Sequence, residues 1–457
     1  MNADPSAPGT YRFVNLGCPK NLVDAERVAA LLESGGWREA PSNDEATLLV
    51  VTTCAFIASA REESLDEIVQ AVAERRPGQR FAVLGCLVSH AGEDVLRRAL
   101  PEVDVFCGVA EMTELPARLA APVPPRSRDA RRGAAAHVHK TTGRKLFTPP
   151  HLAYLKIADG CSNKCAYCSI PSIRGDLASR PMDEILAEAR GLAAMGVREL
   201  VVIAQDTTAW GFDRGGGGRV YDLLEAIADA GLFDWTRLLY THPAHIDAAR
   251  LAPLLRGGAI VPYLDVPIQH ASDRVLELMG RPYTRRALED LFDALRAASS
   301  DLVLRTTVMV GFPGERERDF RELAAFLESA AFDHVGVFAY SRERDTAAAS
   351  LGGRVPARVA LQRRDELLEI QMEISEERLA ARVGTELDVL VDEEVPEEER
   401  PTPGARRAGR FYGQAHDIDG LTYIEGSEAL PGSFVRARIS GSAPYDLFAE
   451  ALPGDFR

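Results

Sequence analysis

The chain is poor in cysteine and has no long hydrophobic run. Seven cysteines stand among 457 residues, so a group of them close together needs a chemical explanation. No apolar stretch approaches the roughly 18 residues that a membrane-spanning helix requires, and the N-terminus MNADPSAPGT lacks a basic-then-apolar signal pattern. We therefore expect no membrane segment and a cytoplasmic, reducing compartment, where thiols do not pair into disulfides.

Basic residues are also in short supply. The chain carries 53 Lys and Arg against 68 Asp and Glu, which gives a net charge of −15. Because nucleic-acid phosphates are bound by clustered Lys and Arg, this balance disfavours passive nucleic-acid binding. It favours a basic protein as the partner.

Three of the cysteines lie together in the run DGCSNKCAYCSIPSIRGD, at Cys161, Cys165 and Cys168. Three thiolates in such a loop can bind one face of a cubane iron–sulfur cluster and leave its fourth iron without a protein ligand. A structural zinc site would need a fourth Cys or His nearby, and His151 begins the strand-like run HLAYLKIA outside the loop. The spacing therefore favours a [4Fe-4S] cluster with one open iron.

Three other cysteines each end a short apolar run. Cys18 ends YRFVNLGC, Cys54 ends TLLVVTTC and Cys86 ends FAVLGC, and such runs are typical of buried parallel strands. The carboxyl ends of parallel strands share one edge of the sheet, so these thiols can converge there; free cysteine also packs well at strand ends. Cys107, in VDVFCGV, has no glycine before it and no clear helix after it, and we expect it to pack in the core.

The sequence predicts an α/β protein of three domains. Residues 11–121 alternate strands and helices, which predicts a doubly wound parallel α/β domain. Residues 122–148 are rich in Pro, Arg and small residues and are predicted to be a linker, with substrate contact as the alternative. Residues 149–381 repeat a strand-then-helix unit that fits a partial (β/α)6 barrel, with its active site at the carboxyl ends of the strands. Residues 384–452 hold short alternating strands, which predict a small antiparallel β-barrel.

The chain resembles a known family over almost its whole length. The segment GCPKNLVDAER, the strand-end cysteines, the loop CSNKCAYCSIPSIRGDLASRP and the segments LDVPIQHASD and VGFPGE are similar to the methylthiotransferase family of radical S-adenosylmethionine (SAM) enzymes. GCPKNLVD together with RGDLASRP resembles the branch that modifies an aspartate of small-subunit ribosomal protein uS12. Ala25 stands where serine is frequent in that branch. The C-terminal strands resemble the TRAM domain, which usually recognises RNA in related enzymes.

The resemblance implies two [4Fe-4S] clusters and SAM as cofactors. The ligands would be Cys18, Cys54 and Cys86 for an auxiliary cluster, and Cys161, Cys165 and Cys168 for the SAM-cleaving cluster. One SAM would donate a methyl group to sulfur held at the auxiliary cluster, and a second would be cleaved to a radical that abstracts hydrogen from carbon. An electron donor such as flavodoxin or ferredoxin would be needed. Arg174 and Arg180 follow the cluster loop and are expected either to neutralise cluster charge or to form ordinary ion pairs.

Four polar side chains of the predicted barrel are candidates for binding SAM. Gln205 and Asp206 end the second strand, where the superfamily holds the SAM amino group. Gln269 on the fourth strand and Arg305 on the fifth are expected at the same end, within reach of the ribose or carboxylate. Each of the four is equally reasonable as a satisfied polar residue at a barrel rim.

Charge distinguishes between the substrates that the resemblance allows. Residues 384–457 hold 15 acidic and 7 basic residues, which disfavours tRNA and suits a Lys- and Arg-rich ribosomal protein, free or in the assembled subunit. The run DEEVPEEE is either a contact for that protein or a solvated loop. Two alternatives remain. One is a tRNA-adenosine methylthiotransferase, which GCPKNLVD and the acidic tail disfavour, and the other is a non-catalytic iron–sulfur or RNA-binding protein.

Overall fold

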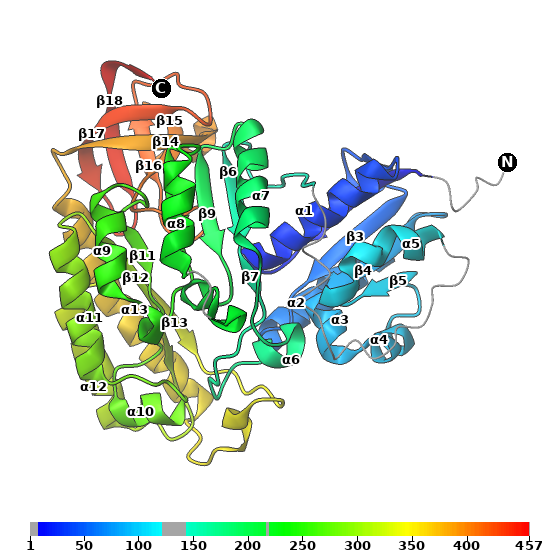
Figure 1. Ribbon diagram of the computed structural model, residues 1–457, viewed down its shortest axis with the longest axis horizontal. Helices are drawn as coiled ribbons and strands as arrows, with labels where there is room; N and C mark the ends of the chain where they lie inside the picture. Colours follow the sequence, from blue (N-terminus) through cyan, green and yellow to red (C-terminus); the bar gives the residue numbers. More distant parts are fainter. Residues whose placement is uncertain (1–7, 121–142, 216–218, 457) are drawn as a thin grey trace.

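Three domains follow one another along the chain (Figure 1). The computed structural model describes residues 8–120, 143–215 and 219–456. In Figure 1 the blue N-terminal domain lies to the right of the central domain, and the orange and red C-terminal barrel lies above it. Residues 122–142, most of the predicted linker, fall outside the described ranges.

The N-terminal domain is a parallel sheet with helices on both faces, in the strand order β2-β1-β3-β4-β5. One face packs on α1 and α5 through Leu48 and Val50, and the other packs on α2, α3 and α4 through Val51 and Val83. This confirms the predicted doubly wound domain, and Cys107 is fully buried in its core. The elements are β1 Thr10–Asn15, α1 Pro19–Ser34, β2 Arg38–Glu39, β3 Leu48–Thr53, α2 Ala58–Ala73, β4 Arg80–Gly85, α3 Cys86–Ala91, α4 Glu93–Ala99, β5 Val105–Cys107 and α5 Leu115–Ala120.

The central domain is an open sheet of six parallel strands, in the order β13-β12-β11-β10-β9-β6. All six predicted barrel strands are present, so the partial barrel is confirmed. The strands are β6 Leu152–Lys156, β9 Glu199–Ile203, β10 Trp235–Leu238, β11 Tyr263–Asp265, β12 Val303–Val310 and β13 His334–Ala339. The helices are α6 Ile170–Arg174, α7 Met182–Ala194, α8 Val220–Asp229, α9 Ala248–Arg256, α10 Asp273–Leu278, α11 Arg285–Ala298, α12 Glu317–Ala330 and α13 Ala357–Ala380, and a small antiparallel pair joins β7 Ala158–Asp159 to β8 Ala178–Ser179.

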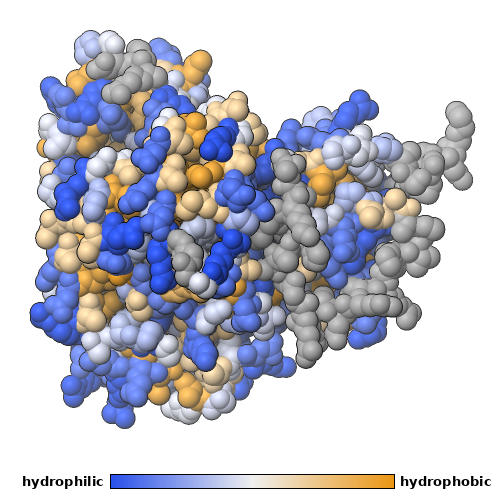
Figure 2. All heavy atoms as spheres, in the orientation of Figure 1, coloured by the Kyte–Doolittle hydropathy of each residue, from blue (hydrophilic) through white to orange (hydrophobic). Residues whose placement is uncertain are grey.

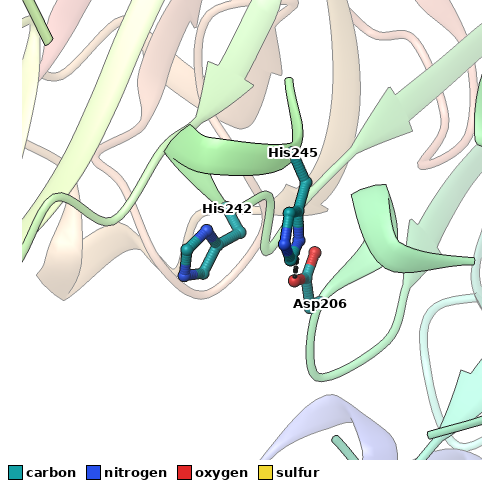
Figure 3. A group of neighbouring side chains, drawn as sticks. All are labelled: Asp206, His242 and His245. Atoms are coloured by element: carbon teal, nitrogen blue, oxygen red, sulfur yellow. Dashed lines mark hydrogen bonds and ion pairs between the residues drawn. The ribbon is translucent and has the colours of Figure 1, made fainter. Parts of the chain in front are cut away.

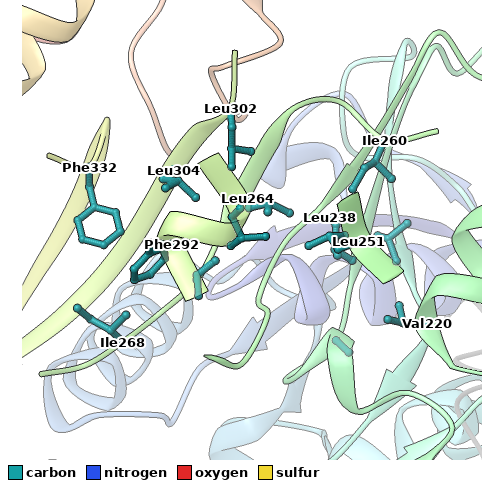
Figure 4. Close-up of a cluster of buried hydrophobic side chains, with 14 of the residues drawn as sticks. Val220, Leu238, Leu251, Ile260, Leu264, Ile268, Phe292, Leu302, Leu304 and Phe332 are labelled. Atoms are coloured by element: carbon teal, nitrogen blue, oxygen red, sulfur yellow. The ribbon is translucent and has the colours of Figure 1, made fainter. Parts of the chain in front are cut away.

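The main core lies between these strands and their covering helices (Figure 4). Leu238, Leu264 and Leu304 on three neighbouring strands pack with Leu251 of α9 and Phe292 of α11. Side chains alternate between the faces of a strand, and on β12 the core-facing residues are buried while the alternate ones are partly exposed. The face of β12 that is turned away from this core is therefore less filled, whereas every residue of β6, β9 and β11 is buried.

The C-terminal domain is a closed five-stranded barrel in the order β14-β15-β16-β18-β17. Its pairs are antiparallel except for β16 with β18, which run parallel. It packs on the amino ends of the central strands, where Arg410 donates to Glu199 of β9 (2.6 Å) and Tyr263 of β11 donates to Asp419 (2.7 Å). The strands are β14 Glu386–Glu394, β15 Ala405–Phe411, β16 Thr422–Glu425, β17 Phe434–Ser442 and β18 Leu447–Phe456.

The described end of the predicted linker packs between domains instead of extending into solvent. Arg144 forms ion pairs with Glu26 of α1 and with Glu188 of α7. Phe147 packs against Phe13 of β1, with ring centroids 5.3 Å apart. Residues 143–148 therefore help to fasten the N-terminal domain to the central one.

The outer surface is mixed in character. Hydrophilic and hydrophobic residues are interspersed on the face in Figure 2, and α11 and α12 carry ion pairs one turn apart, such as Arg285 with Glu289 and Arg318 with Glu322. Across the described ranges, no helix has the length and apolar character of a membrane span.

Replacing Leu264 with Ala should destabilise the central domain. Leu264 is fully buried at the middle of the sheet, so the change removes buried apolar area and leaves a cavity. Together these should lower the free energy of unfolding by about 2–5 kcal/mol. Urea unfolding of the apo-protein measures it. The control is Leu361→Ala on α13, whose residue is 43% exposed, and equal unfolding midpoints for the two variants would contradict this account of the core.

Candidate active site between two cysteine triads

Cys18, Cys54 and Cys86 follow the carboxyl ends of β1, β3 and β4, which are neighbours in the sheet. Glycine precedes two of them because the backbones approach closely. Gly17 has φ +96°, and a Cβ there would lie 3.1 Å from the Cβ of Cys54; one on Gly85 (φ +102°) would lie 3.0 Å from a carbonyl oxygen of β3. The fold thus brings the three predicted auxiliary ligands, here called the auxiliary triad, to one edge of the sheet.

Polar groups and cations surround the auxiliary triad. Asn21 of α1 accepts a hydrogen bond from the Cys86 thiol (3.4 Å) and another from Arg174. Burial raises the pKa of the Cys18 thiol, but Lys20, Arg174 and backbone N–H groups of α1 more than offset this and leave that pKa below its ordinary value. The thiolate that a metal requires is therefore favoured at Cys18.

The second triad, Cys161, Cys165 and Cys168, lies in the loop beyond β6 and is here called the loop triad. The β7–β8 pair closes the base of this loop, so the loop stands at the carboxyl end of the first barrel strand, as predicted. Arg281 donates to the Tyr167 hydroxyl at 2.6 Å and 3.0 Å and fixes the loop against the barrel. Burial raises the pKa of Cys161 to about 11 and that of Cys168 to about 12.

The spread of the sulfur atoms tests whether these triads suit a cluster. Among the His, Cys, Asp and Glu residues that the structure describes, one group of three has ligand atoms all within 4.8 Å of one another. It consists of Asp206, His242 and His245, so neither cysteine triad meets this limit. In a cubane each thiolate binds a different iron, so the ligands stand farther apart than those of a single ion. Neither triad is therefore gathered as closely as the ligands of a lone zinc ion.

A buried ion network joins the two triads. Lys156 of β6 pairs with Asp24 of α1 and with Asp159 (2.8 Å), and Arg174 pairs with Asp24 (3.2 Å) and Asp159 (2.9 Å). All four side chains are at most 1% exposed. Arg174 ends α6, the helix that follows the loop triad, and it reaches Asn21 beside the auxiliary triad. The network therefore ties the two triads together.

Arg174 and Arg180 differ in role. Arg174 combines the two expected roles, because it pairs with carboxylates and also lies beside the auxiliary triad. Arg180 forms an ion pair with Glu188 (2.7 Å) and donates to the carbonyl of Lys156. Arg180 thus takes part in an ordinary buried ion pair.

Two candidate SAM residues lie close to the loop triad. The Gln205 amide nitrogen donates to Asp159 (3.4 Å), while its Oε1 is buried without a hydrogen-bond partner among the described residues. Asp206 accepts from Asn163 of the cluster loop (2.8 Å) and pairs with His245 (2.8 Å). Gln205 thus keeps a free acceptor, whereas Asp206 is held by protein groups.

The other two candidates do not share one end of the sheet, because Gln269 follows β11 by four residues and Arg305 stands near the start of β12. Gln269 has φ +66°, and its backbone N–H donates to Thr307 of β12 (2.8 Å). Arg305 pairs with Asp265 (3.0 Å) and with Asp419 of the C-terminal barrel (3.5 Å). Arg305 is the third residue of the eight-residue β12, so it lies toward the amino end beside the C-terminal domain and not at the carboxyl end that the sequence predicts.

Sequence reasoning missed two histidines beside Asp206 (Figure 3). His242 and His245 stack with ring centroids 4.6 Å apart, and the dashed line in Figure 3 joins His245 to Asp206. Burial lowers the pKa of His242 to about 3, so this ring is neutral. The run THPAH after the third barrel strand was the available signal. The sequence analysis also missed Lys20, Asp24 and Lys156, because their partners are distant in the chain.

Comparison with known families matches all three domains. The Radical SAM superfamily matches residues 155–327, the Uncharacterized protein family UPF0004 matches residues 10–108, and the TRAM domain matches residues 383–452. A ribosomal protein uS12 methylthiotransferase RimO of Syntrophus aciditrophicus is 42% identical over 97% of this chain and 98% of its own. The chain belongs to the RimO family of methylthiotransferases.

Further RimO relatives agree. Those of Pelotomaculum thermopropionicum and Clostridioides difficile are 41% and 38% identical, each over 96% of this chain and 98% of its own. The radical SAM methyltransferase TsrM from Kitasatospora setae, solved with cobalamin and a [4Fe-4S] cluster, has a TM-score of 0.53 at 16% identity over 75% of this chain and 77% of its own. That likeness shows the fold alone. Membership of the RimO family makes this chain a radical SAM transferase that uses SAM and [4Fe-4S] clusters.

Asp24→Ala should weaken the packing of the N-terminal domain on the central domain. The change leaves Lys156 and Arg174 with one buried carboxylate in place of two, and breaking a buried ion pair costs about 3–5 kcal/mol. Urea unfolding and limited proteolysis of the apo-protein measure the effect. The control is Asp44→Ala, which removes an exposed pair with Arg76 worth at most about 1 kcal/mol; equal effects would contradict the role given to the network.

Proposed function

We propose that this protein transfers a methylthio group to the β-carbon of an aspartate in small-subunit ribosomal protein uS12. The observation that carries the proposal is the pair of cysteine triads joined through Arg174 and Asp24, in a chain of the RimO family. The relatives are methylthiotransferases of ribosomal protein uS12, and this supports uS12 as the substrate. The acidic C-terminal domain supports a cationic protein over tRNA.

We propose that each triad binds one [4Fe-4S] cluster. The proposed ligands are Cys18, Cys54 and Cys86 for the auxiliary cluster, and Cys161, Cys165 and Cys168 for the SAM-cleaving one. When bound, the two clusters supply a site for sulfur and an electron for reductive cleavage of SAM, which together allow chemistry at an unactivated carbon. The protein itself then has to bind and orient the cofactors and to exclude water from the site.

The side chains around the triads suit those tasks. Arg281 and Tyr167 fix the cluster loop, and the network of Lys156 and Arg174 fixes the auxiliary triad relative to it. Gln205 is the best supported SAM contact, because its buried Oε1 lacks a partner among the residues described. Asp206, Gln269 and Arg305 remain proposed SAM residues, and Asp206 also anchors Asn163 of the loop.

The C-terminal barrel offers an acidic surface for a basic partner. Within the run DEEVPEEE, Asp392 turns inward to Arg410 (2.7 Å), while the segment Glu397–Glu399 is exposed. Exposed carboxylates attract a cationic protein through screened electrostatics. We propose uS12, free or in the assembled subunit, as the substrate, with a flavodoxin or ferredoxin as electron donor and the cytoplasm as the compartment.

Iron content tests the ligand assignment. Anaerobically reconstituted protein should hold about eight irons, and replacing the loop triad with Ala should leave about four. Replacing the auxiliary triad should also leave about four irons, with SAM cleavage still measurable and methylthiolation lost, because the two triads lie in different domains. Full iron content in either triple variant would show that the assignment is wrong.

Mass analysis of a deletion strain tests the substrate. Ribosomal protein uS12 from that strain should lack the added mass of a methylthio group, whereas its tRNA adenosines should carry unchanged modifications. Restoring the wild-type gene should restore the modification, and a gene with the loop triad replaced should not. Unmodified tRNA with normal uS12 would instead support the tRNA-adenosine alternative.

A further inference from the structure

Lys20 is a buried cation beside the auxiliary triad. It is the second residue of α1, two positions after Cys18, and it is 8% exposed. Its Nζ lies 3.4 Å from the centroid of the Tyr240 ring, at the end of β10. The side chain thus reaches from the auxiliary triad to the wall of the central barrel.

Among the described residues, most buried cations form an ion pair with a carboxylate, and the ammonium of Lys20 does not. Lys156 pairs with Asp24 and Asp159, and Arg237 pairs with Glu199. Within the described ranges, the Lys20 ammonium makes no hydrogen bond and no ion pair with a carboxylate. It contacts the Tyr240 ring and lies near the Cys18 thiol, whose pKa it lowers. A buried charge that is not paired is costly, and a desolvated cation–π contact offsets about 2 kcal/mol of that cost.

The nearby carboxylates are already committed to other groups. Asp265 pairs with Arg305 (3.0 Å) and accepts from the backbone N–H of Tyr240 (3.1 Å). Asp159 is shared by Lys156 and Arg174. Arg174, rather than Lys20, is the cation bonded to Asn21 beside Cys86. None of these carboxylates forms an ion pair with Lys20, so the carboxylate of a bound substrate fits beside its ammonium.

Tyr240 is held in place beneath Lys20. Its φ of +59° lies in the left-handed region, which is strained for a bulky residue and persists only where neighbours enforce it. Asp265 binds its N–H, and Thr207 donates its own backbone N–H to the Tyr240 carbonyl (3.0 Å). The ring therefore keeps the ammonium at one position between the two domains.

We propose that Lys20 binds the carboxylate of the target aspartate. This inference rests on the proposed function, in which the β-carbon next to that carboxylate receives sulfur at the auxiliary triad. A carboxylate on Lys20 places that carbon beside the triad and on the side facing the barrel. It gives Lys20 the paired carboxylate that no described residue provides. Lys20 is thus a substrate-positioning residue, and GCPKNLVD contains a specificity determinant.

Binding of uS12 and of uS12 with its target aspartate changed to asparagine tests the proposal. Wild-type protein with both clusters loaded should bind the aspartate form about thirtyfold or more tightly than the asparagine form, because loss of one partner of a buried charge pair costs at least about 2 kcal/mol. Lys20→Met should bind both forms alike, and Lys20→Arg should recover part of the preference. The control is Lys145→Met, which removes a partly exposed lysine paired with Glu33 and Glu39 and should keep the preference.

Two measurements separate substrate positioning by Lys20 from a role in holding the auxiliary cluster. They are the iron content and the electron paramagnetic resonance signal of the reduced protein. A Lys20→Met protein that loses auxiliary iron, or changes that signal, yet still prefers aspartate would overturn the proposal. Equal binding of the two uS12 forms by wild-type protein would overturn it without any variant, so misfolding of Lys20→Met cannot hide a failure. If wild-type protein modifies uS12 but Lys20→Met keeps the preference, Lys20 alone is misassigned. If wild-type protein neither binds nor modifies uS12, the proposed function fails and this inference falls with it.

Discussion

The buried charge network between α1 and β6 is the constraint on which the active site depends. Asp24 of α1, Lys156 of β6 and Arg174 after the cluster loop share contacts in a region at most 1% exposed. Each of these charges would be costly if the domains parted, because none would keep its full set of partners. The network therefore fixes one orientation of the N-terminal domain on the barrel, and with it the relation between the two cysteine triads.

The same orientation creates the unusual position of Lys20. The helix that supplies Asp24 to the network also begins at the auxiliary triad, so the ammonium two residues after Cys18 is pressed against Tyr240 of the barrel. Arg305 of β12 and Asp265 of β11 then complete a row of charges that ends at Asp419 of the C-terminal domain. The three domains thus meet through buried polar contacts rather than through an apolar interface alone.

Division of labour follows from where each domain packs. The N-terminal domain lies at the carboxyl ends of the barrel strands, beside the loop triad, whereas the C-terminal barrel covers the amino ends through Arg410 and Glu199. This C-terminal barrel carries the exposed acidic segment Glu397–Glu399, which follows the last cysteine by more than two hundred residues in the chain. This arrangement suits a module that recognises a substrate surface while the other two domains act on one residue of it.

The strands, the domain order and the six cysteines could be read from the sequence, because apolar periodicity and the spacing of Cys161, Cys165 and Cys168 are local properties of the chain. The barrel strands and the edge that gathers Cys18, Cys54 and Cys86 followed from general rules of parallel sheets. The ion partners did not follow, since Asp24 lies 132 residues from Lys156 and 150 from Arg174. Nor did the contact of Lys20 with Tyr240 or the pairing of Asp206 with His245. Such contacts depend on how the folded domains pack against one another. Only the tertiary structure therefore decides which buried cation meets a carboxylate and which does not.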